Sequence, residues 1–261
     1  AHGVVPTARA DAISGPLAAG LALLEKSLLE PPPFEPMTTE RRFEVAASDY
    51  AEFLLLPPLL RTLAREAPKL AVSIRPLAAD PFRALVRGDI DLVLGVNRPG
   101  SGAPDIQSRH LFDERLACVV REGHPLTRGR FTLARFAAAK HVLIAPQGTP
   151  GGPVDDALAA RGLRRHTAVT VPHFLAAPHI VAQTDLVLTM ASRLAASFAT
   201  MLPLRILEPP VELPLVAAFL FWHERCASDP AHAWFRERIA EAARVRLSAR
   251  HSRRRQGRSK G

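Results

Sequence analysis

Hydrophobic residues in the first thirty positions follow the period of an α-helix with one narrow apolar face. Steps of three or four residues place five of them on the same side of a helix: Ile13, Leu17, Leu21, Leu24 and Leu28. Thr7 precedes them and suits the N-cap position. A narrow stripe is typical of a seam between two helices rather than of a face that covers a broad core. The pattern predicts a dimerisation helix over 10–30, bent near Gly15-Pro16.

Prolines separate this helix from the rest of the chain. Pro31-Pro32-Pro33 stops the helix, and Pro36 keeps the following residues extended. The sequence therefore predicts a linker over 31–39 and a domain boundary there.

Strands and helices alternate from Arg41 onward. Apolar runs and period-two alternation predict strands at 43–47, 70–76, 90–96, 106–109, 115–120, 141–145, 166–171, 186–190 and 211–222. Helices are predicted at 81–86, 131–139, 154–161, 174–182, 191–199 and 231–245, and in one segment from Phe53 that starts or kinks near Pro57-Pro58. This order predicts an α/β fold with parallel sheets and right-handed crossovers.

The net charge of +9 is concentrated at the C-terminus. Eight cationic residues and no acidic residue lie between 244 and 261, which leaves about +1 for residues 1–243. Such a run predicts a disordered, solvated tail over 247–261, with salt-sensitive attraction to phosphates as the alternative. The body of the chain is not expected to be a basic nucleic-acid surface.

Membrane and secretory signals are missing from the sequence. No apolar run approaches the roughly 18 residues that a membrane span needs, and no cationic stretch precedes an apolar one at the N-terminus. Cys118 and Cys226 are too few for a disulfide framework, so a cytoplasmic protein is expected.

Catalytic signatures are also missing. The sequence has no GxSxG elbow, no Walker A loop and no GxGxxG turn. Its ten histidines include no HExxH motif, and neither cysteine has zinc-site spacing. We therefore expect no enzyme activity, no catalytic residue, no metal and no cofactor.

Binding of a small molecule remains the favoured function. In open parallel sheets, ligands sit beyond the carboxyl ends of the strands. Polar loop residues that meet this geometry are Ser48, Asp49, Asp80, Asn97, Gln147, Gly148, Thr149 and His173. Ser48 and Thr149 also suit helix capping, so each residue has a structural alternative.

The chain resembles LysR-type transcriptional regulators, of the nodulation and aromatic-degradation kind, along almost its whole length. The similar segments are Gly3–Ala10, at the end of a winged helix-turn-helix, Arg42–Tyr50 with Leu55–Leu60, Gly88–Gly95, His124–Leu126, and Trp222–Arg225 with Asp229–His232 and Trp234. Their order and spacing, more than any single one, carry the resemblance.

The resemblance implies two Rossmann-like lobes of the type 2 periplasmic-binding-protein kind, preceded by the dimerisation helix. Residues 1–9 would be a remnant of the wing, and 40–246 the effector-binding domain, with lobe I at 40–114 and 219–246 and lobe II at 115–218. A small effector, an aromatic or other organic acid, would occupy the cleft of a homodimer or tetramer. Promoter DNA would be contacted only by the DNA-reading helices that the resemblance places before Ala1, so the chain as given is expected not to recognise an operator.

Three other interpretations stay open at this point. A periplasmic solute-binding protein would have the same two lobes, but with a secretory signal and without the N-terminal helix. An enzyme on this fold would need a constellation of reactive groups that the loop tips do not offer. A partner that pairs with full-length relatives and blocks them would look the same in sequence.

Overall fold

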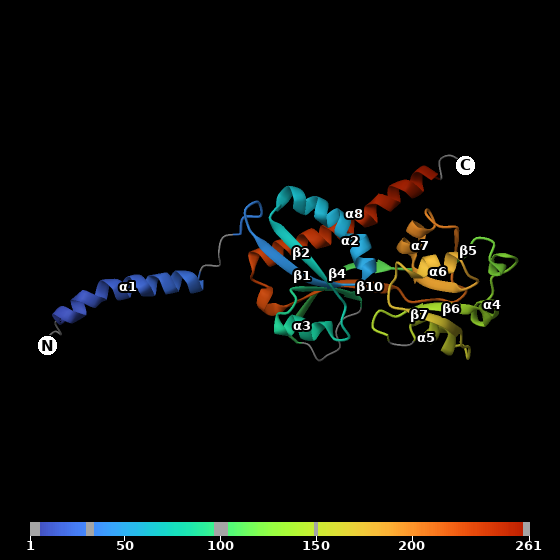
Figure 1. Cartoon of the computed structure of the whole chain (residues 1–261), viewed down its shortest axis with the longest axis horizontal. Coiled ribbons are helices and arrows are strands. Elements are labelled where there is room, and N and C mark those ends of the chain that lie inside the picture. Colours follow the sequence, from blue (N-terminus) through green and yellow to red (C-terminus); the bar gives the residue numbers. More distant parts are fainter. Residues whose placement is uncertain (1–5, 30–33, 97–103, 149–150, 258–261) are drawn as a thin grey trace.

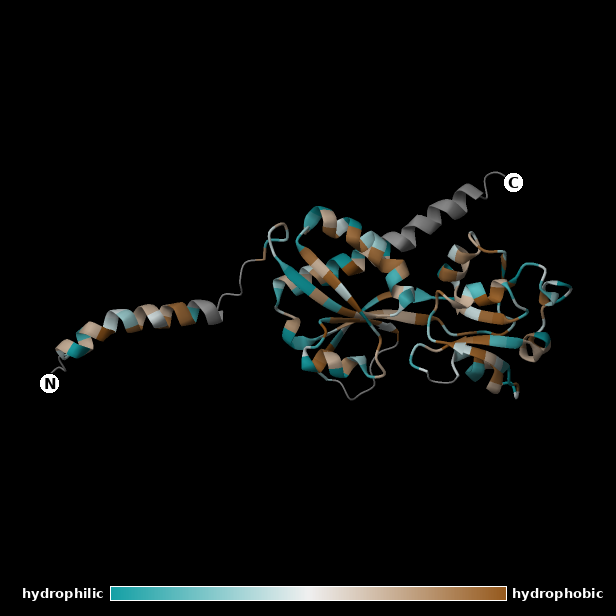
Figure 2. Ribbon diagram, in the orientation of Figure 1, coloured by the Kyte–Doolittle hydropathy of each residue, from teal (hydrophilic) through white to brown (hydrophobic). Residues whose placement is uncertain are grey.

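The computed structural model describes residues 6–29, 34–96, 104–148 and 151–257, with only the backbone described for 26–29 and 245–257. It contains a separate N-terminal helix, α1 (Ala8–Leu29), and two lobes that lie side by side (Figure 1). Hydrophobic residues gather on the central strands of both lobes, and polar residues cover the outer helix faces (Figure 2). This arrangement confirms the predicted fold class.

The first lobe is built on a five-stranded mixed sheet of order β2-β1-β3-β10-β4. Its elements are β1 (Arg41–Ala47), α2 (Asp49–Glu66), β2 (Leu70–Pro76), α3 (Pro81–Arg87), β3 (Leu92–Val96), β4 (Ile106–Glu114), β10 (Val216–His223), the short 3-10 helix η2 (Glu224–Cys226) and α8 (Pro230–Gly257). β1 pairs in parallel with β2 and β3, whereas β10 runs antiparallel to β3 and β4.

Alternation along β1 explains how this sheet is covered on both faces. Phe43 and Val45 are buried in the core that α2 and α8 share, and Phe43 stacks on Phe235 of α8 with ring centroids 4.2 Å apart. Ala46 belongs instead to the core beneath α3. Successive strand residues point to opposite faces, so an apolar strand can serve two helical layers.

The second lobe repeats the plan with the order β7-β6-β8-β5-β9. Its elements are β5 (Leu116–Arg121), the 3-10 helix η1 (Pro125–Thr127), α4 (Leu133–Ala138), β6 (Lys140–Ile144), α5 (Pro153–Ala159), β7 (His166–Val171), α6 (Ala177–Ala182), β8 (Val187–Ala191), α7 (Ser192–Phe198) and β9 (Leu204–Leu207). β6 is parallel to β7 and β8, and β5 is antiparallel to β8 and β9. The sequence analysis missed β9, because four residues give too short a periodic signal.

Two crossings connect the lobes. The chain leaves the first sheet after Glu114 and returns at Val216, which pairs with Glu114 in the β10–β4 ladder. Residues 216–218 therefore lie in the first sheet, which corrects the predicted start of this return at Phe219. The two crossing segments, after Glu114 and before Val216, therefore lie next to each other.

Two predicted helix boundaries are also corrected. α2 begins at Asp49 and runs through Pro57 and Pro58, because Ser48 caps it and Leu55, Leu59 and Leu63 bury one face. α6 begins at Ala177 rather than at 174, since the preceding backbone amides have other acceptors, described below.

The basic C-terminal segment is helical in the structure up to Gly257, whereas the sequence analysis predicted disorder from 247. The packed first half of α8 supplies the helix nucleus, and residues 231–256 contain neither proline nor glycine. Its many arginines have good helix propensity, so the helix continues beyond the lobe.

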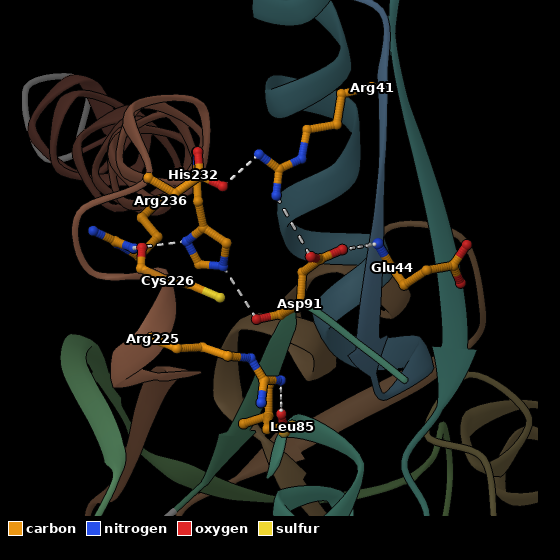
Figure 3. A network of polar contacts seen from close by, with 9 residues as sticks. Arg41, Glu44, Leu85, Asp91, Arg225, Cys226, His232 and Arg236 are labelled. Atoms are coloured by element: carbon orange, nitrogen blue, oxygen red, sulfur yellow. Dashed lines mark hydrogen bonds and ion pairs between the residues drawn. The ribbon is translucent and has the colours of Figure 1, made fainter. Parts of the chain in front are cut away.

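A polar network ties α8 to the strands beneath it (Figure 3). Arg41 binds Asp229 at 2.6 Å and faces Asp91 at 3.8 Å, and the Asp91 carboxylate accepts the backbone N–H of Glu44 at 2.8 Å. Buried His232 contacts the Asp91 carbonyl through Nε2 at 3.2 Å. These contacts fix the helix against the start of β3.

Candidate functional site

A cavity of about 560 Å³ lies between the lobes and takes residues from both. Its apolar wall includes Leu55, Leu94, Phe112, Phe174, Leu215 and Phe219. Its polar groups come from Ser48, Tyr50, Glu114, Gln147, Arg165 and Thr189. A mostly apolar hollow with a few polar groups is the usual form of a small-molecule site.

Strand ends supply part of this cavity, as the sequence analysis expected. Ser48 follows β1 and Gln147 follows β6, and both line it. The Ser48 Oγ accepts the backbone N–H of Ala51 at 3.4 Å, and the Gln147 amide donates to the Ala78 carbonyl of the other lobe at 3.2 Å. Each side chain thus has a structural contact as well as access to the cavity.

The other predicted site residues are placed differently. Asp80 caps α3 by accepting the backbone N–H of Arg83 at 3.1 Å, and Asp80, Gly148 and His173 are not among the residues that line the cavity. Asn97 and Thr149 lie outside the described residues.

Asp49 joins the two lobes instead of lining the cavity. Its carboxylate accepts the backbone N–H groups of Phe174 at 3.1 Å and Leu175 at 2.8 Å, both in the second lobe. These two amides precede α6, which explains its late start. Hydrogen bonds to a carboxylate are stronger than bonds between neutral groups, so Asp49 stabilises the observed arrangement of the lobes.

Glu114 forms a second junction at the crossing. Its side chain is 5% exposed, accepts hydrogen bonds from Tyr50 and Ser192, and pairs with Arg193 at 2.6 Å. Burial and the adjacent Glu114 carboxylate raise the pKa of Tyr50 far above its usual value, so the phenol stays protonated and donates. First-lobe Tyr50 and second-lobe Arg193 therefore meet on one carboxylate.

Arg165 and Asp155 form an ion pair in the second lobe. The guanidinium binds Asp155 through Nε at 2.8 Å and Nη2 at 2.7 Å, and its side chain is only 3% exposed. The hydrogen bonds from Arg165 hold the pKa of Asp155 below its usual value. The Asp155 carboxylate is therefore ionised at neutral pH.

Cys118 and Thr189 are cross-strand neighbours on β5 and β8, with Sγ and Oγ1 3.6 Å apart. Burial raises the pKa of Cys118 to about 12. The group is therefore a thiol at neutral pH rather than a reactive thiolate.

The described residues were compared with the requirements of a metal site and of a membrane-spanning helix. No group of three His, Cys, Asp or Glu side chains is arranged there to hold a metal ion. None of the described helices combines the length and the hydrophobicity that a bilayer crossing requires.

Sequence reasoning missed Tyr50, Glu114, Arg165 and Thr189, for one reason. Tyr50 lies inside a helix, and Glu114 and Thr189 lie inside strands, while Arg165 precedes a strand. A search of the loops after strands passes over all of these positions. The crossing itself was a usable signal for Glu114, since residues between two lobes lie near their cleft.

The chain matches known transcriptional regulators over most of its length. Residues 38–244 match the family described as the LysR substrate binding domain. The HTH-type transcriptional activator NahR of Pseudomonas putida is 34% identical over 241 residues, which are 90% of this chain and 78% of NahR. Nodulation protein D 2 of Rhizobium tropici is 31% identical over 247 residues, 94% of this chain and 78% of that protein. These relatives give no support to a periplasmic solute-binding role.

Solved structures share the fold. The probable transcriptional regulator PA0477 of Pseudomonas aeruginosa has a TM-score of 0.74 and 33% identity, covering 90% of this chain and 77% of that one. The BenM effector-binding domain with its effector benzoate (TM-score 0.64, 17% identity, 82% and 95% covered) and the QuiR effector-binding domain with shikimate (TM-score 0.66, 16% identity, 79% and 99% covered) show the same fold. The chain thus belongs to the LysR family and contains the effector-binding domain of a LysR-type transcriptional regulator.

Proposed function

We propose that the cavity between the lobes binds a small organic acid, and that this binding controls a transcriptional regulator. The observation that carries the proposal is the two-lobed cavity of about 560 Å³, whose apolar wall holds a few polar groups. Structures of the same fold hold benzoate and shikimate, both small carboxylic acids. Phe112, Phe174 and Phe219 offer apolar faces against which a ring can pack.

Ligand binding would act by favouring one arrangement of the lobes. Asp49 and Glu114 hold the lobes together in the observed arrangement. A ligand that contacts both lobes binds this arrangement more tightly than an open one, and so increases its population. Promoter DNA would be contacted by a helix-turn-helix domain, the domain after which HTH-type relatives such as NahR are named. The regulator would act in the cytoplasm.

Titration calorimetry and thermal unfolding with benzoate and shikimate test the proposal. A ligand that binds only the folded state raises the melting temperature with concentration. Ser48→Gly removes a cavity hydroxyl and keeps an acceptable N-cap. We expect it to weaken acid binding by about three- to tenfold, as the loss of one hydrogen bond does.

The matched control is Ser228→Gly, because Ser228 is exposed and lies away from the cavity. It should leave the affinity unchanged. If neither these acids nor a wider panel of aromatic and alicyclic carboxylates binds at millimolar concentration, the proposal is wrong.

We further propose that α1 pairs with α1 of a second copy. Thr7 caps this helix by accepting the backbone N–H of Ala10 at 3.2 Å, as expected. Ile13, Leu17, Leu21 and Leu24 are between 53% and 60% exposed, and the side chain of Leu28 lies outside the described part of the chain. α1 extends away from both lobes (Figure 1), so its apolar stripe is open to a partner helix.

Aspartate substitutions in this stripe should abolish the pairing. In Leu17→Asp/Leu21→Asp, two charges replace apolar contacts at the seam, and a charge cannot be buried there without a large desolvation cost. Light scattering after size-exclusion chromatography should show a loss of subunits relative to the unmodified chain. Ala19→Asp/Ala22→Asp, on the opposite side of the helix, should keep the original mass. An unmodified chain that is monomeric at micromolar concentration rules out this pairing.

A further inference from the structure

Among the residues that the structure describes, two charged side chains line the cavity, and their environments differ. Glu114 receives hydrogen bonds on both oxygens, from Ser192 on one and from Tyr50 and Arg193 on the other. Its acceptor capacity is therefore engaged within the protein. A ligand gains little by approaching it, and an anionic group there would meet its negative charge.

Arg165 is the other charged group, and one of its nitrogens is still available. Nε and Nη2 bind Asp155, whereas Nη1 has no hydrogen-bond partner among the residues that the structure describes. The Arg165 side chain is 3% exposed, and it lines the cavity. The guanidinium therefore keeps a donor position that a ligand or a water molecule in the cavity can accept from.

The bond to Asp155 fixes where this donor points. A bidentate pair orients the planar guanidinium through two parallel hydrogen bonds. The Asp155 carboxylate offsets most of the Arg165 charge. The site therefore favours a ligand with one negative charge over a ligand with several. Arg165 is thus oriented before any ligand arrives, and ordering it adds no further entropy cost on binding.

Thr189 adds a neutral donor to the same cavity. Its Oγ1 faces the protonated thiol of Cys118, which can donate to that oxygen. The threonine hydroxyl hydrogen is then directed to another acceptor. Two donors of the second lobe, one charged and one neutral, therefore contribute to the cavity wall.

We propose that Arg165 binds the acidic group of the effector, which makes the cavity selective for a singly charged organic anion such as a monocarboxylate. This inference rests on the proposed function and adds the residue that recognises the negative charge of the ligand. The ring or alicyclic body of the ligand then packs on the apolar wall, and Ser48 and Gln147 reach its other polar groups. A dicarboxylate is disfavoured, because Glu114 is the other charged side chain among the described lining residues, and it repels a second negative charge.

The test compares benzoate with benzamide, its neutral isostere, by titration calorimetry on the full chain. Arg165→Gln should reduce the ratio of benzoate to benzamide affinity at least tenfold, since only the acid loses a charged partner. Arg164→Gln is the matched control, because Arg164 is exposed and adjacent in sequence. It should leave the ratio unchanged, and phthalate should bind the unmodified chain more weakly than benzoate does.

A second variant distinguishes a loss of charge recognition from a loss of folding. In Asp155→Asn/Arg165→Gln, two amides replace the ion pair and no buried charge is left alone. The same loss of acid selectivity is expected there. If either folded variant keeps the benzoate preference of the unmodified chain, the assignment of Arg165 is wrong even though acids bind. If the unmodified chain binds no organic acid, the proposed function itself fails, and this assignment with it.

Discussion

Glu114→Ala is expected to lower the free energy of unfolding by about 3–5 kcal/mol, the usual cost of removing one partner from a buried ion pair. The substitution removes the carboxylate that faces the Arg193 guanidinium, which is 2.6 Å away and 21% exposed. Tyr50 and Ser192 lose an acceptor at the same time. All three partners are partly buried, so water replaces the lost contacts only in part.

Urea unfolding at neutral pH measures this effect. Glu114→Gln keeps an acceptor oxygen and should lose less stability than Glu114→Ala. Glu122→Ala is the control, because Glu122 is exposed, and it should change stability by about 0.5 kcal/mol or less. A loss below about 1 kcal/mol in Glu114→Ala would mean that the crossing is held by other contacts.

A double-mutant cycle with Arg193→Ala connects this stability to the junction of the lobes. The two single substitutions share one interaction, so their effects should not add. Arg193 also lies over the Phe112 ring, 4.9 Å from its centroid, and Phe112 lines the cavity. Loosening this junction is therefore expected to weaken effector binding as well.

Local periodicity was enough to predict the architecture. β2 and β7 have the predicted bounds, and the caps at Asp80 and Gly88 enclose α3 as expected. These elements depend on neighbours in sequence, which a single chain reveals. α2 was harder, because Pro57 and Pro58 are local signals against a helix that burial of Leu55 and Leu59 overrides.

The cavity was predictable only where it follows strand ends. Ser48 and Gln147 meet that rule, while Arg165 reaches the cavity as a long side chain from a position before β7. Asp49 also follows a strand, but its carboxylate accepts backbone N–H groups of the other lobe instead of lining the cavity. Which of two roles a polar residue has depends on the packing of the lobes, and that packing leaves no periodic trace in the sequence.

Mild acid should destabilise the protein before its carboxylates protonate, and His141 should cause much of the loss. This residue is fully buried, its Nε2 donates to the Phe136 carbonyl at 2.8 Å, and its Nδ1 has no partner in the described part of the chain. Burial lowers the pKa of His141 from 6.5 to about 4, and the nearby Arg165 charge acts in the same direction. Protonation would place a cation in an apolar core beside another cation, with no acceptor for the new N–H.

The sign follows from proton uptake. Between pH 6.5 and pH 4 the unfolded chain binds a proton at His141 and the folded chain does not, so the free energy of unfolding falls as the pH falls. At about 1.4 kcal/mol per unit, the loss reaches about 2 kcal/mol by pH 5 and about 3 kcal/mol by pH 4. The pKa of buried His232 is also lowered, chiefly by burial, and adds a loss of the same sign.

Protonation of the carboxylates destabilises the protein in a lower pH range than protonation of the histidines does. The pKa values of Asp155, Asp229 and Glu237 are lowered in the folded protein, chiefly through hydrogen bonds and arginine partners that outweigh burial. Their stabilisation is present above the unfolded pKa and is lost only as the pH falls below about 5. Urea unfolding between pH 6.5 and pH 5 therefore reports mainly on His141 and His232.

His141→Gln isolates the contribution of one residue, because glutamine can still donate to the Phe136 carbonyl but does not titrate. The variant is expected to be less stable at pH 7 and to lose about 2 kcal/mol less than the unmodified protein on going to pH 5. His166→Gln, at an exposed position, should retain the full pH dependence. Parallel pH profiles for His141→Gln and the unmodified protein would show that His141 takes up its proton equally in both states, which is incompatible with a neutral, enclosed imidazole beside Arg165.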